Sequence, residues 1–498
     1  MTRLLPFFIA LPLGCAFLVN LFKNKKAADV LANLCTFILL VLSLATISIV
    51  KAHGIVVYKV GNWIPPIGIS MVVDGLTVFL LVTVNLVSFL SSLYSIDYME
   101  KYTAKPKFYS LFLLMLTGMN GLIVTGDLFN MFVFLELAGV ASYALVAFGT
   151  EAEELEASFK YMILSSLSAS FVLLGVTMIY SYTSSLNMAD VALTLAQKSS
   201  SPDVTILFIA VLFLMGFGLK AAIVPFHPWL PDAHPSAPAP ISAMLSGVLI
   251  KALGIYAMLR VFFCILGASP LFLETLCILG ILSMIVGVLL AIGQWDVKRL
   301  FAYHSISQVG YVLLGIGLGT PLGILGGLFH LFNHSMFKSL LFLNSGSLDY
   351  AAGTRNLKEM GGLKDAMPVT EKTSLVASLS ISGIPPFNGF WSKLFIIVAC
   401  VQARHPGYAL WAIIGSLLTL SSFMKVMRYA FYGMPKKAYA SLKEAPSSMQ
   451  AAMIILAIIC LLGGVLLFPL FRNALLQPAV DVLLNGKNYA TIVFSQLK

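Results

Sequence analysis

The chain has 498 residues, of which 59% are hydrophobic and 10% are charged, and its mean hydropathy is +0.94. Soluble domains carry about 25% charged residues, so this composition excludes an ordinary soluble enzyme, a disordered chain and a nucleic-acid-binding protein. The net charge of +10 comes from 31 Lys and Arg against 21 Asp and Glu, and in a membrane protein it bears first on topology. At about 20 apolar residues per crossing, the length allows about fourteen spanning helices.

Apolar runs bounded by glycine, proline and charged residues predict membrane helices along the whole chain. The first run is too long for the core of a signal peptide and lacks an A-x-A cleavage site, so we expect a retained helix. The polar stretches 184–203, 347–372, 433–449 and the tail after Phe471 leave no room for a soluble domain. The predicted spans are 4–22, 28–50, 70–95, 107–125, 127–149, 157–183, 204–224, 238–266, 270–293, 299–318, 322–346, 373–401, 407–432 and 450–471.

Lysine and arginine residues in alternate loops predict the orientation of the chain. By the positive-inside rule the richer side faces the cytoplasm, so we expect a multi-pass protein of the cell inner (plasma) membrane with both termini outside. The acidic loop 151–156 lies on the inner side and weighs little in this rule. The inner side holds Lys23, Lys25, Lys26, Lys101, Lys105, Lys107, Lys298, Arg299, Arg355, Lys358, Lys364, Lys372, Lys436, Lys437 and Lys443, and the outer side holds Arg3, Lys51, Lys59, Lys198, Arg404, Arg472, Lys487 and Lys498.

The six cysteines are scattered through apolar stretches without C-x-x-C spacing. This distribution predicts no iron–sulfur cluster, zinc site or disulfide framework. We expect the cysteines to be small apolar residues on helix surfaces, and we expect no cofactor in this chain. They are Cys15, Cys35, Cys264, Cys277, Cys400 and Cys460.

Eight of the Lys and Arg residues remain inside the predicted helices or at their ends, and Glu136 lies in mid-span. A lysine at the bilayer centre costs at least ~2.5–3.5 kcal/mol, so such residues are retained where they face one another or a hydrated interior. One interpretation is a chain of protonatable groups, and the alternative is a set of buried ion pairs that stabilise packing. The size of the set favours the first. The eight are Lys160, Lys220, Lys251, Arg260, Lys338, Lys393, Lys425 and Arg428.

Position within the span divides these charged residues into two groups. Lys160, Arg260 and Arg428 lie near helix ends, where long basic side chains can extend to the lipid headgroups. Asp74 and Asp127 lie near helix starts. The deeper group comprises Lys220, Lys251, Lys338 and Lys393.

His330, His334 and Lys338 stand at positions i, i+4 and i+8. At 100° per residue these three side chains share one face of a helix. His-x-x-x-His spacing suits zinc, but no third ligand stands at zinc spacing and there is no H-E-x-x-H motif. Because histidine titrates near neutral pH, a proton relay is the favoured interpretation and no metal is expected.

Two segments have the pattern of interrupted helices. In the first, Lys220 follows two glycines and precedes Pro225, Pro228 and Pro231, and in the second, Gly383-Ile-Pro-Pro-Phe-Asn-Gly389 precedes Lys393. Proline removes a backbone donor and clashes with the preceding turn, so both helices are expected to unwind beside their lysine. Paired interruptions of this kind in two halves point to the ion site of a transporter.

A weak internal repeat also indicates two halves. Glu136–Tyr143 aligns without gaps on His304–Tyr311, at an offset of 168 residues. Three further pairs follow at similar offsets. Lys160 and His330 are 170 residues apart, Lys220 and Lys393 are 173 apart, and Lys251 and Lys425 are 174 apart. Helices five apart cross the membrane in opposite directions, so the two halves are predicted to be inverted repeats.

These residues resemble a known family. Three segments are similar to the antiporter-like subunits of Mrp cation/proton antiporters, membrane-bound energy-converting hydrogenases and respiratory complex I. They are Glu136 in its Gly-Asp-Leu-Phe-Asn…Phe-Leu-Glu context, Lys220 in Gly-Leu-Lys-Ala-Ala, and the segment 231–238 leading to Lys251. The resemblance covers roughly 70–430. It implies fourteen helices with two inverted five-helix repeats, broken helices 7 and 12, and proton transfer along a central hydrated axis.

The resemblance also implies a role for each matching residue. Glu136 would be the essential glutamate of helix 5 and Lys220 the broken-helix lysine of helix 7, while Lys251 would bridge the halves on helix 8. Lys393 would be the terminal lysine of helix 12, unlike the complex I subunit that carries glutamate there. The predicted proton-transfer residues are Glu136, Lys220, Lys251, His304, His330, His334, Lys338 and Lys393, with Lys160, Asp74 and Lys425 as secondary candidates.

The predicted organisation has four parts: helices 1–3 (1–106), the first repeat (107–266), the second repeat (267–432), and helix 14 with the tail (433–498). The closest similarity is to the D-type Mrp subunit and its counterpart in hydrogenases, and a complex I-type pump subunit is the alternative. A stand-alone solute transporter and a structural scaffold are hypotheses from other classes. The expected partners are the lipid bilayer, other antiporter-like and small membrane subunits, hydrogenase or other redox subunits, and protons with or without Na⁺.

Overall fold

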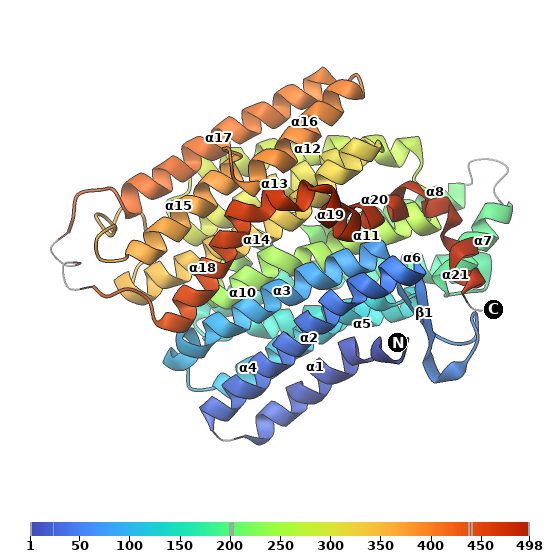
Figure 1. The fold of residues 1–498 in the computed structure, drawn as a ribbon, viewed down its shortest axis with the longest axis horizontal. Helices are drawn as coiled ribbons and strands as arrows, with labels where there is room; N and C mark the ends of the chain where they lie inside the picture. The colour runs from blue at the N-terminus through green and yellow to red at the C-terminus, as the bar shows by residue number, and fades with distance from the viewer. Residues whose placement is uncertain (1, 23, 199–203, 437–438, 440–441, 497–498) are drawn as a thin grey trace.

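The computed structural model describes residues 2–22, 24–198, 204–436, 439 and 442–496. The described chain is almost entirely helical (Figure 1), which confirms the predicted all-α membrane fold in its coarse form. Ten of its helices are long and apolar enough to cross a membrane, and α1 (Phe7–Leu18) and α16 (Asn388–Gln402) are shorter apolar helices. Lys23, Lys437 and Lys498, which entered the topology prediction, lie outside the described residues.

The chain begins with α1, α2 (Lys25–His53) and α3 (Gly75–Tyr98). A two-stranded antiparallel sheet lies between α2 and α3, and it pairs β1 (Val56–Lys59) with β2 (Ser70–Val73). This hairpin was not predicted from the sequence, because each strand has only four residues. Figure 1 shows β1 at the same end of the molecule as the two ends of the chain.

The remaining helices are described in two sets, one that precedes α12 in the chain and one that begins with α12. The first set is α4 (Lys105–Val124), α5 (Leu128–Val146), α6 (Ala152–Thr183), α7 (Met188–Lys198), α8 (Val204–Ala221), α9 (Leu230–Ser236), α10 (Ala239–Met244) and α11 (Ala257–Leu259). The second set is α12 (Pro270–Ile292), α13 (Val297–Gly317), α14 (Pro321–Ala352), α15 (Pro368–Ser382), α16, α17 (Pro406–Ala430), α18 (Ser447–Leu462), α19 (Pro469–Phe471), α20 (Gln477–Leu484) and α21 (Tyr489–Ser495).

Several helix boundaries differ from those predicted. α8 ends at Ala221, and the predicted span 373–401 consists of α15 and α16 with the non-helical stretch 383–387 between them. α7, α20 and α21 lie in stretches predicted to be polar loops, because short helices that pack on the bundle need no long apolar run. The predicted span 238–266 is helical, with π-helical turns at 245–249, 251–256 and 260–265.

The core of the bundle is built around α14. Every residue from Gly323 to Leu348 is buried, and α14 packs against α3, α10, α13, α15, α16 and α18. The segment 239–265 is also buried along its whole length, whereas α2, α6 and α17 bury less than half of their apolar windows. The polar residues on α14 and on 239–265 therefore face protein and not lipid.

The interface between α12 and α13 depends on small residues. A Cβ atom at Gly310 would lie 2.4 Å from the carbonyl oxygen of Gly280, and one at Gly287 would lie 2.6 Å from the backbone nitrogen of Ser307. Small residues let helix backbones approach closely in membranes. Asp296 caps the start of α13 by accepting a hydrogen bond from the Arg299 backbone N–H, which fixes where that helix begins.

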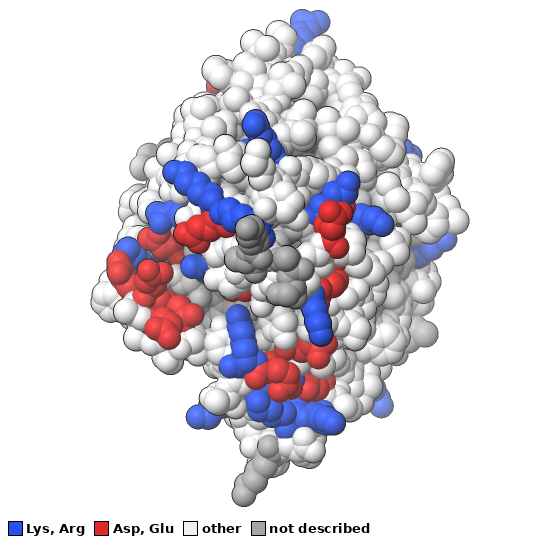
Figure 2. Space-filling model, turned by 90° about the vertical axis from the view of Figure 1, so that its left-hand side faces the viewer, with Lys and Arg blue, Asp and Glu red and all other residues white. Residues whose placement is uncertain are grey.

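Charged side chains of both signs gather on the end of the molecule opposite the chain termini, as Figure 2 shows. Ion pairs also join helix ends, with Arg299 Nη2 of α13 3.4 Å from Asp232 Oδ1 of α9, and Lys101 Nζ 3.9 Å from Asp349 Oδ2 of α14. Two residues counted as loop charges in the prediction are instead buried in helices. Lys105 pairs with Asp29 at 2.7 Å, and Lys298 donates to a backbone carbonyl.

Candidate functional site

Glu136 and Lys220 form an ion pair between α5 and α8. Lys220 Nζ lies 3.4 Å from Glu136 Oε1 and also donates a hydrogen bond to the Ser165 hydroxyl of α6. The Lys220 side chain is 2% exposed, whereas that of Glu136 is 30% exposed. The structure thus brings together the two predicted residues that are 84 positions apart in the chain.

The end of α8 beside Lys220 is held by residues from outside the helix. The Trp229 indole donates a hydrogen bond to the Leu219 carbonyl over 2.9 Å. Gly254 packs so closely on this helix end that a Cβ atom there would lie 2.5 Å from the backbone nitrogen of Ala221. Non-helical backbone at membrane depth is tolerated where it is buried in protein, and here a neighbouring helix and an indole supply that environment.

Lys251 and Lys338 are connected by two serine hydroxyls. Lys251 Nζ donates to the Ser246 carbonyl over 2.5 Å, and the Ser246 hydroxyl lies 2.7 Å from that of Ser305. The Ser305 hydroxyl in turn donates to the Phe301 carbonyl, which also accepts a hydrogen bond from Lys338 Nζ. Neither serine was predicted from the sequence. The available signal was one hydroxyl next to His304 and another five residues before Lys251.

The three predicted histidines are buried on α13 and α14. His304 Nε2 lies 2.9 Å from the Ser422 hydroxyl, and His330 Nδ1 lies 2.9 Å from the Ser392 hydroxyl. The rings of His330 and His334 are nearly parallel, with centroids 6.4 Å apart. The predicted shared face of α14 is therefore occupied by stacked imidazoles that can accept and donate protons.

Lys393 lies directly beside the interruption between α15 and α16. Its Nζ donates to the Ile381 carbonyl over 2.8 Å and to the Ser416 hydroxyl over 3.2 Å, and it lies 4.6 Å from the centroid of the Tyr311 ring. The side chain is buried. Lys393 thus donates a hydrogen bond to a backbone carbonyl at the end of α15, as Trp229 does at the end of α8.

Several buried polar atoms along these helices lack a hydrogen-bond partner within the described part of the chain. They include both ring nitrogens of His334, both side-chain polar atoms of Gln308, His304 Nδ1 and His330 Nε2. Buried polar groups are nearly always satisfied, so these atoms mark positions where internal water can bind. Gln308, one helical turn after His304, was not among the predicted residues.

Two of the secondary candidates lie apart from these contacts. Lys160 is 48% exposed and pairs with Glu156 at 2.7 Å and Asp232 at 3.3 Å. Lys425 Nζ donates to the carbonyls of Ile292 and Gln294 over 2.7 and 2.6 Å, at the end of α12. A cation at that position satisfies terminal carbonyls of the helix and complements its dipole.

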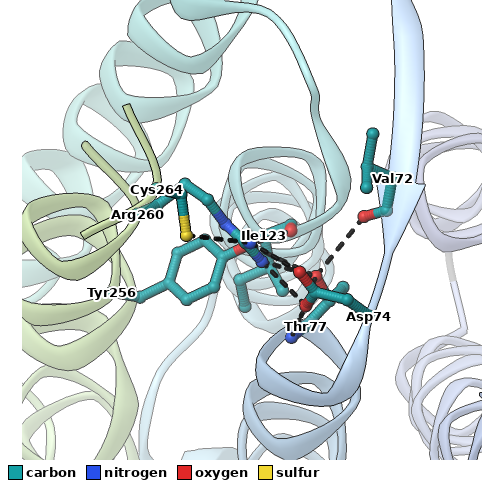
Figure 3. Close-up of polar contacts among 7 residues, drawn as sticks. All are labelled: Val72, Asp74, Thr77, Ile123, Tyr256, Arg260 and Cys264. Carbon is teal, nitrogen blue, oxygen red and sulfur yellow. Dashed lines mark hydrogen bonds and ion pairs between the residues drawn. The ribbon is translucent and has the colours of Figure 1, made fainter. Parts of the chain in front are cut away.

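The third secondary candidate, Asp74, belongs to a separate buried cluster (Figure 3). Arg260 binds it with two hydrogen bonds, from Nη1 to Oδ2 at 2.6 Å and from Nη2 to Oδ1 at 2.9 Å. Thr77 and Tyr256 also accept hydrogen bonds from this guanidinium. The expectation that Arg260 extends to the headgroups is wrong, because its side chain is 2% exposed and a buried carboxylate holds it.

Comparisons with known proteins agree with this arrangement. The family model for NADH:quinone oxidoreductase/Mrp antiporter membrane subunits matches residues 125–419, and the model for the N-terminus of complex I chain 5 matches residues 63–109. The chain is 34% identical over 473 residues to the D-type subunit of the Na⁺/H⁺ antiporter of Alkalihalophilus pseudofirmus, covering 95% of each protein. It is also 34% identical to the N-type subunit of the NADH-quinone oxidoreductase of Desulforudis audaxviator, covering 85% of this chain and 86% of that one.

Two solved structures have the same fold over nearly their full length. A chain of the Mrp complex from Dietzia sp. superposes with a TM-score of 0.91 at 27% identity, covering 99% of each chain. A chain of the archaeal membrane-bound sulfane sulfur reductase superposes with a TM-score of 0.90 at 29% identity, covering 99% of this chain and all of that one. The protein therefore belongs to the NADH:quinone oxidoreductase/Mrp antiporter family of multi-pass membrane proteins.

Proposed function

We propose that this chain is a proton-translocating, antiporter-like subunit of a multisubunit complex of the Mrp or membrane-bound hydrogenase type. The observation that carries the proposal is the Glu136–Lys220 ion pair beside the end of α8. A lysine this deeply buried is retained where its charge has a partner or where it exchanges a proton. The 34% identity to the D-type subunit of an Na⁺/H⁺ antiporter supports the same function.

The mechanism starts with the Glu136 carboxylate holding the Lys220 ammonium. Separation of the two leaves the ammonium in a poorly solvated site without its counter-charge, which favours loss of its proton. The proton then passes along Lys251 and the face of α14 that carries the histidines and Lys338. It leaves past Lys393 toward the outer side, and conformational changes in neighbouring subunits drive the cycle.

The finer architecture in this proposal has fourteen spans. Adding α1, α13, α14 and the α15–α16 pair to the ten long apolar helices gives that number. The inverted repeats occupy 107–266 and 267–432, flanked by 1–106 and 433–498, and helices 7 and 12 are broken. The end of α8 at Ala221 and the stretch 383–387 between α15 and α16 support the two breaks.

Partner subunits are proposed to cover the face of α5 that carries Glu136. This carboxylate is 30% exposed although it lies in the middle of a membrane helix. An ionised group facing hydrocarbon is unfavourable, so protein or a water-filled interface must lie against it. Other antiporter-like or small membrane subunits fit this position, in the plasma membrane with both termini outside.

A redox-driven complex is the second candidate, favoured by the 34% identity to a subunit of an NADH-quinone oxidoreductase. In that case the electron carriers would belong to partner subunits, and this chain would supply the proton pathway. Purification of the native complex followed by identification of its subunits separates the two candidates. Redox subunits would identify a hydrogenase or complex I type, and small antiporter subunits alone would identify an Mrp type.

The proposal is tested by Lys220→Ala and Glu136→Gln in the assembled complex. We expect each variant to lower proton transport in membrane vesicles by at least about a hundredfold, because each removes a proton-transfer partner. Glu274→Gln is the matched control, since that carboxylate is exposed at the start of α12. Near-normal transport in both variants, with normal amounts of assembled complex, would refute the proposal.

A further inference from the structure

A cavity of about 370 Å³ lies between the end of α2, the start of α3 and the C-terminal helices α20 and α21. These elements meet at the end of the molecule that carries both chain termini (Figure 1). The volume falls within the range of about 300–1,000 Å³ that is typical of sites for small ligands. Asp74 is the one predicted site residue that lines the cavity, so the space is separate from the proposed proton pathway.

The walls of the cavity are mainly apolar. One of them belongs to α2, which exposes large apolar side chains along much of its length, from Val30 to Leu44. A helix with such a surface is solvated by lipid, so the cavity at its end can be entered by an apolar chain from the bilayer. The apolar lining residues include Ile47, Val50, Val78, Pro478, Val482 and Ile492.

The base of the cavity carries no free charge, although Asp74 lies there. This carboxylate accepts two hydrogen bonds from Arg260 and one from the backbone N–H of Thr77 (Figure 3). Gly75 beside it packs against α20 so closely that a Cβ atom would lie 2.4 Å from the Pro478 carbonyl oxygen. Because the polar groups at the base already have partners, an apolar chain can lie against them without leaving a buried charge uncompensated.

The lining also includes one exposed cation and one exposed carboxylate. Lys51 lies in the last turn of α2, and Asp481 lies on α20. Neither forms an ion pair with a residue that the structure describes. The Asp481 carboxylate accepts a hydrogen bond only from the neutral Gln477 amide, over 2.9 Å. Charged side chains at the end of a membrane helix lie at the level of the lipid headgroups, so this pair is placed to meet one.

We propose that this cavity binds one acyl chain of a phosphatidylethanolamine-type phospholipid, whose phosphate contacts Lys51 and whose primary ammonium contacts Asp481. A lipid with both charges satisfies both exposed groups, whereas an anionic lipid without an amine satisfies Lys51 alone. The acyl chain fills the apolar space and keeps water away from the Asp74–Arg260 pair. This assignment does not depend on the proposed function.

The test uses the assembled complex in phosphatidylcholine nanodiscs that contain one of two photoactivatable lipids. Both probes carry a diazirine on the acyl chain, and their headgroups are phosphatidylethanolamine and phosphatidylglycerol. Mass spectrometry of the cross-linked peptides measures labelling of residues 47–55 and 474–492. We expect the phosphatidylethanolamine probe to label them about twofold to fivefold more, which is the ratio that one exposed ion pair provides. The lipid-facing helix α17 is the internal reference, and both probes should label it equally.

Three variants separate the contributions of the headgroup and the chain. Asp481→Asn should make the two probes label the cavity equally, because only the ethanolamine ammonium uses this carboxylate. Lys51→Gln should lower labelling by both probes about twofold to fivefold, since both carry the phosphate. Val482→Trp should abolish labelling of the cavity, because the indole occupies the space of the chain. Lys487→Gln is the matched control, an exposed lysine at the same end that does not line the cavity, and should change neither probe.

Two results would overturn the proposal. Equal labelling of the cavity by both probes in the unaltered complex would remove the headgroup assignment. Labelling of α17 without any labelling of the cavity would show that a partner subunit and not a lipid fills it. Should Val482→Trp fail to assemble, the comparison of Asp481→Asn with the unaltered complex decides, since that exposed side chain is not required for packing.

Discussion

The hydroxyl groups of Ser246 and Ser305 lie 2.7 Å apart and join the buried segment 239–265 to α13. Ser246 stands on the buried segment that carries Lys251, and Ser305 stands on α13 next to His304. The Ser246 carbonyl accepts a hydrogen bond from Lys251 Nζ. The Ser305 hydroxyl and Lys338 Nζ both donate to the Phe301 carbonyl. The pair therefore gives the helix of Lys251 a direct polar contact with α13.

Removal of this hydroxyl pair should slow transport without unfolding the protein. Each such hydrogen bond contributes about 0.5–1.5 kcal/mol, so Ser246→Ala or Ser305→Ala should lower the transport rate roughly threefold to tenfold. The double variant should be no slower than the slower single variant, because either substitution alone breaks the contact. Ser88→Ala is the matched control, since that buried hydroxyl donates to its own helix at Val84. Unchanged rates in both single variants would contradict a role for the pair.

The Asp74–Arg260 cluster should act mainly on stability. Asp74→Asn leaves the buried guanidinium without its charge partner, and breaking such a pair destabilises by about 3–5 kcal/mol. The thermal midpoint of the purified complex and its yield measure this effect. Glu156→Gln, which breaks the exposed pair with Lys160, should leave the thermal midpoint and the yield essentially unchanged, because solvent screens that pair. Equal losses of thermal midpoint and yield in the two variants would show that the buried Asp74–Arg260 pair stabilises the protein no more than the exposed pair does.

Substitution of Gly310 should disrupt the contact between α12 and α13. A valine there would bring its Cβ to 2.4 Å from the Gly280 carbonyl oxygen, a backbone atom that cannot rotate away. Overpacking of this kind destabilises by about 1–3 kcal/mol or more, so Gly310→Val should lower the thermal midpoint and the yield of complex. Gly407→Val, at a glycine with open space around its Cβ position, serves as the control and should leave both unchanged.

Lys393 should be required for transport but not for assembly. Lys393→Ala removes the ammonium at the interruption between α15 and α16, and we expect transport to fall by at least about a hundredfold, because a proton-transfer group is lost. The Ile381 carbonyl loses its donor, so a moderate fall in stability accompanies the change. Lys198→Ala removes an exposed lysine of α7 and should transport normally. Normal transport in Lys393→Ala would remove this residue from the proton pathway.

The spans and the principal charged residues could be predicted because they depend on local composition. An apolar run such as 127–149 has to cross the bilayer wherever the rest of the chain lies, and Glu136 is conspicuous within it. Arg260 was misassigned because its partner Asp74 is 186 positions away, and proximity to a helix end says nothing about such a contact. The β1–β2 hairpin escaped prediction for a similar reason, since its short strands are stabilised by each other and not by a periodic pattern.

The residues that connect the predicted site residues were the hardest to find. Ser246, Ser305 and Gln308 are common residue types in apolar helices, and their chemistry becomes apparent only when another helix places a polar group beside them. His234 was visible in the sequence, but nothing there showed that its ring is fully buried and packs against that of Phe342. A lysine in a membrane helix is rare enough to be recognised as a candidate from the sequence alone. Hydroxyls, amides and single histidines are too common there to be recognised in that way.

The partial exposure of Glu136 ties the folding of this chain to its assembly. In a free copy the Glu136 side chain keeps 30% of its surface exposed at membrane depth, which is unfavourable for a polar group, and contact with a neighbour would cover it. By mass action, the apparent stability of the chain then rises with the concentration of that neighbour. Unassembled copies would be the less stable population and the first to be degraded, so the abundance of this protein in a cell should follow the abundance of its partners.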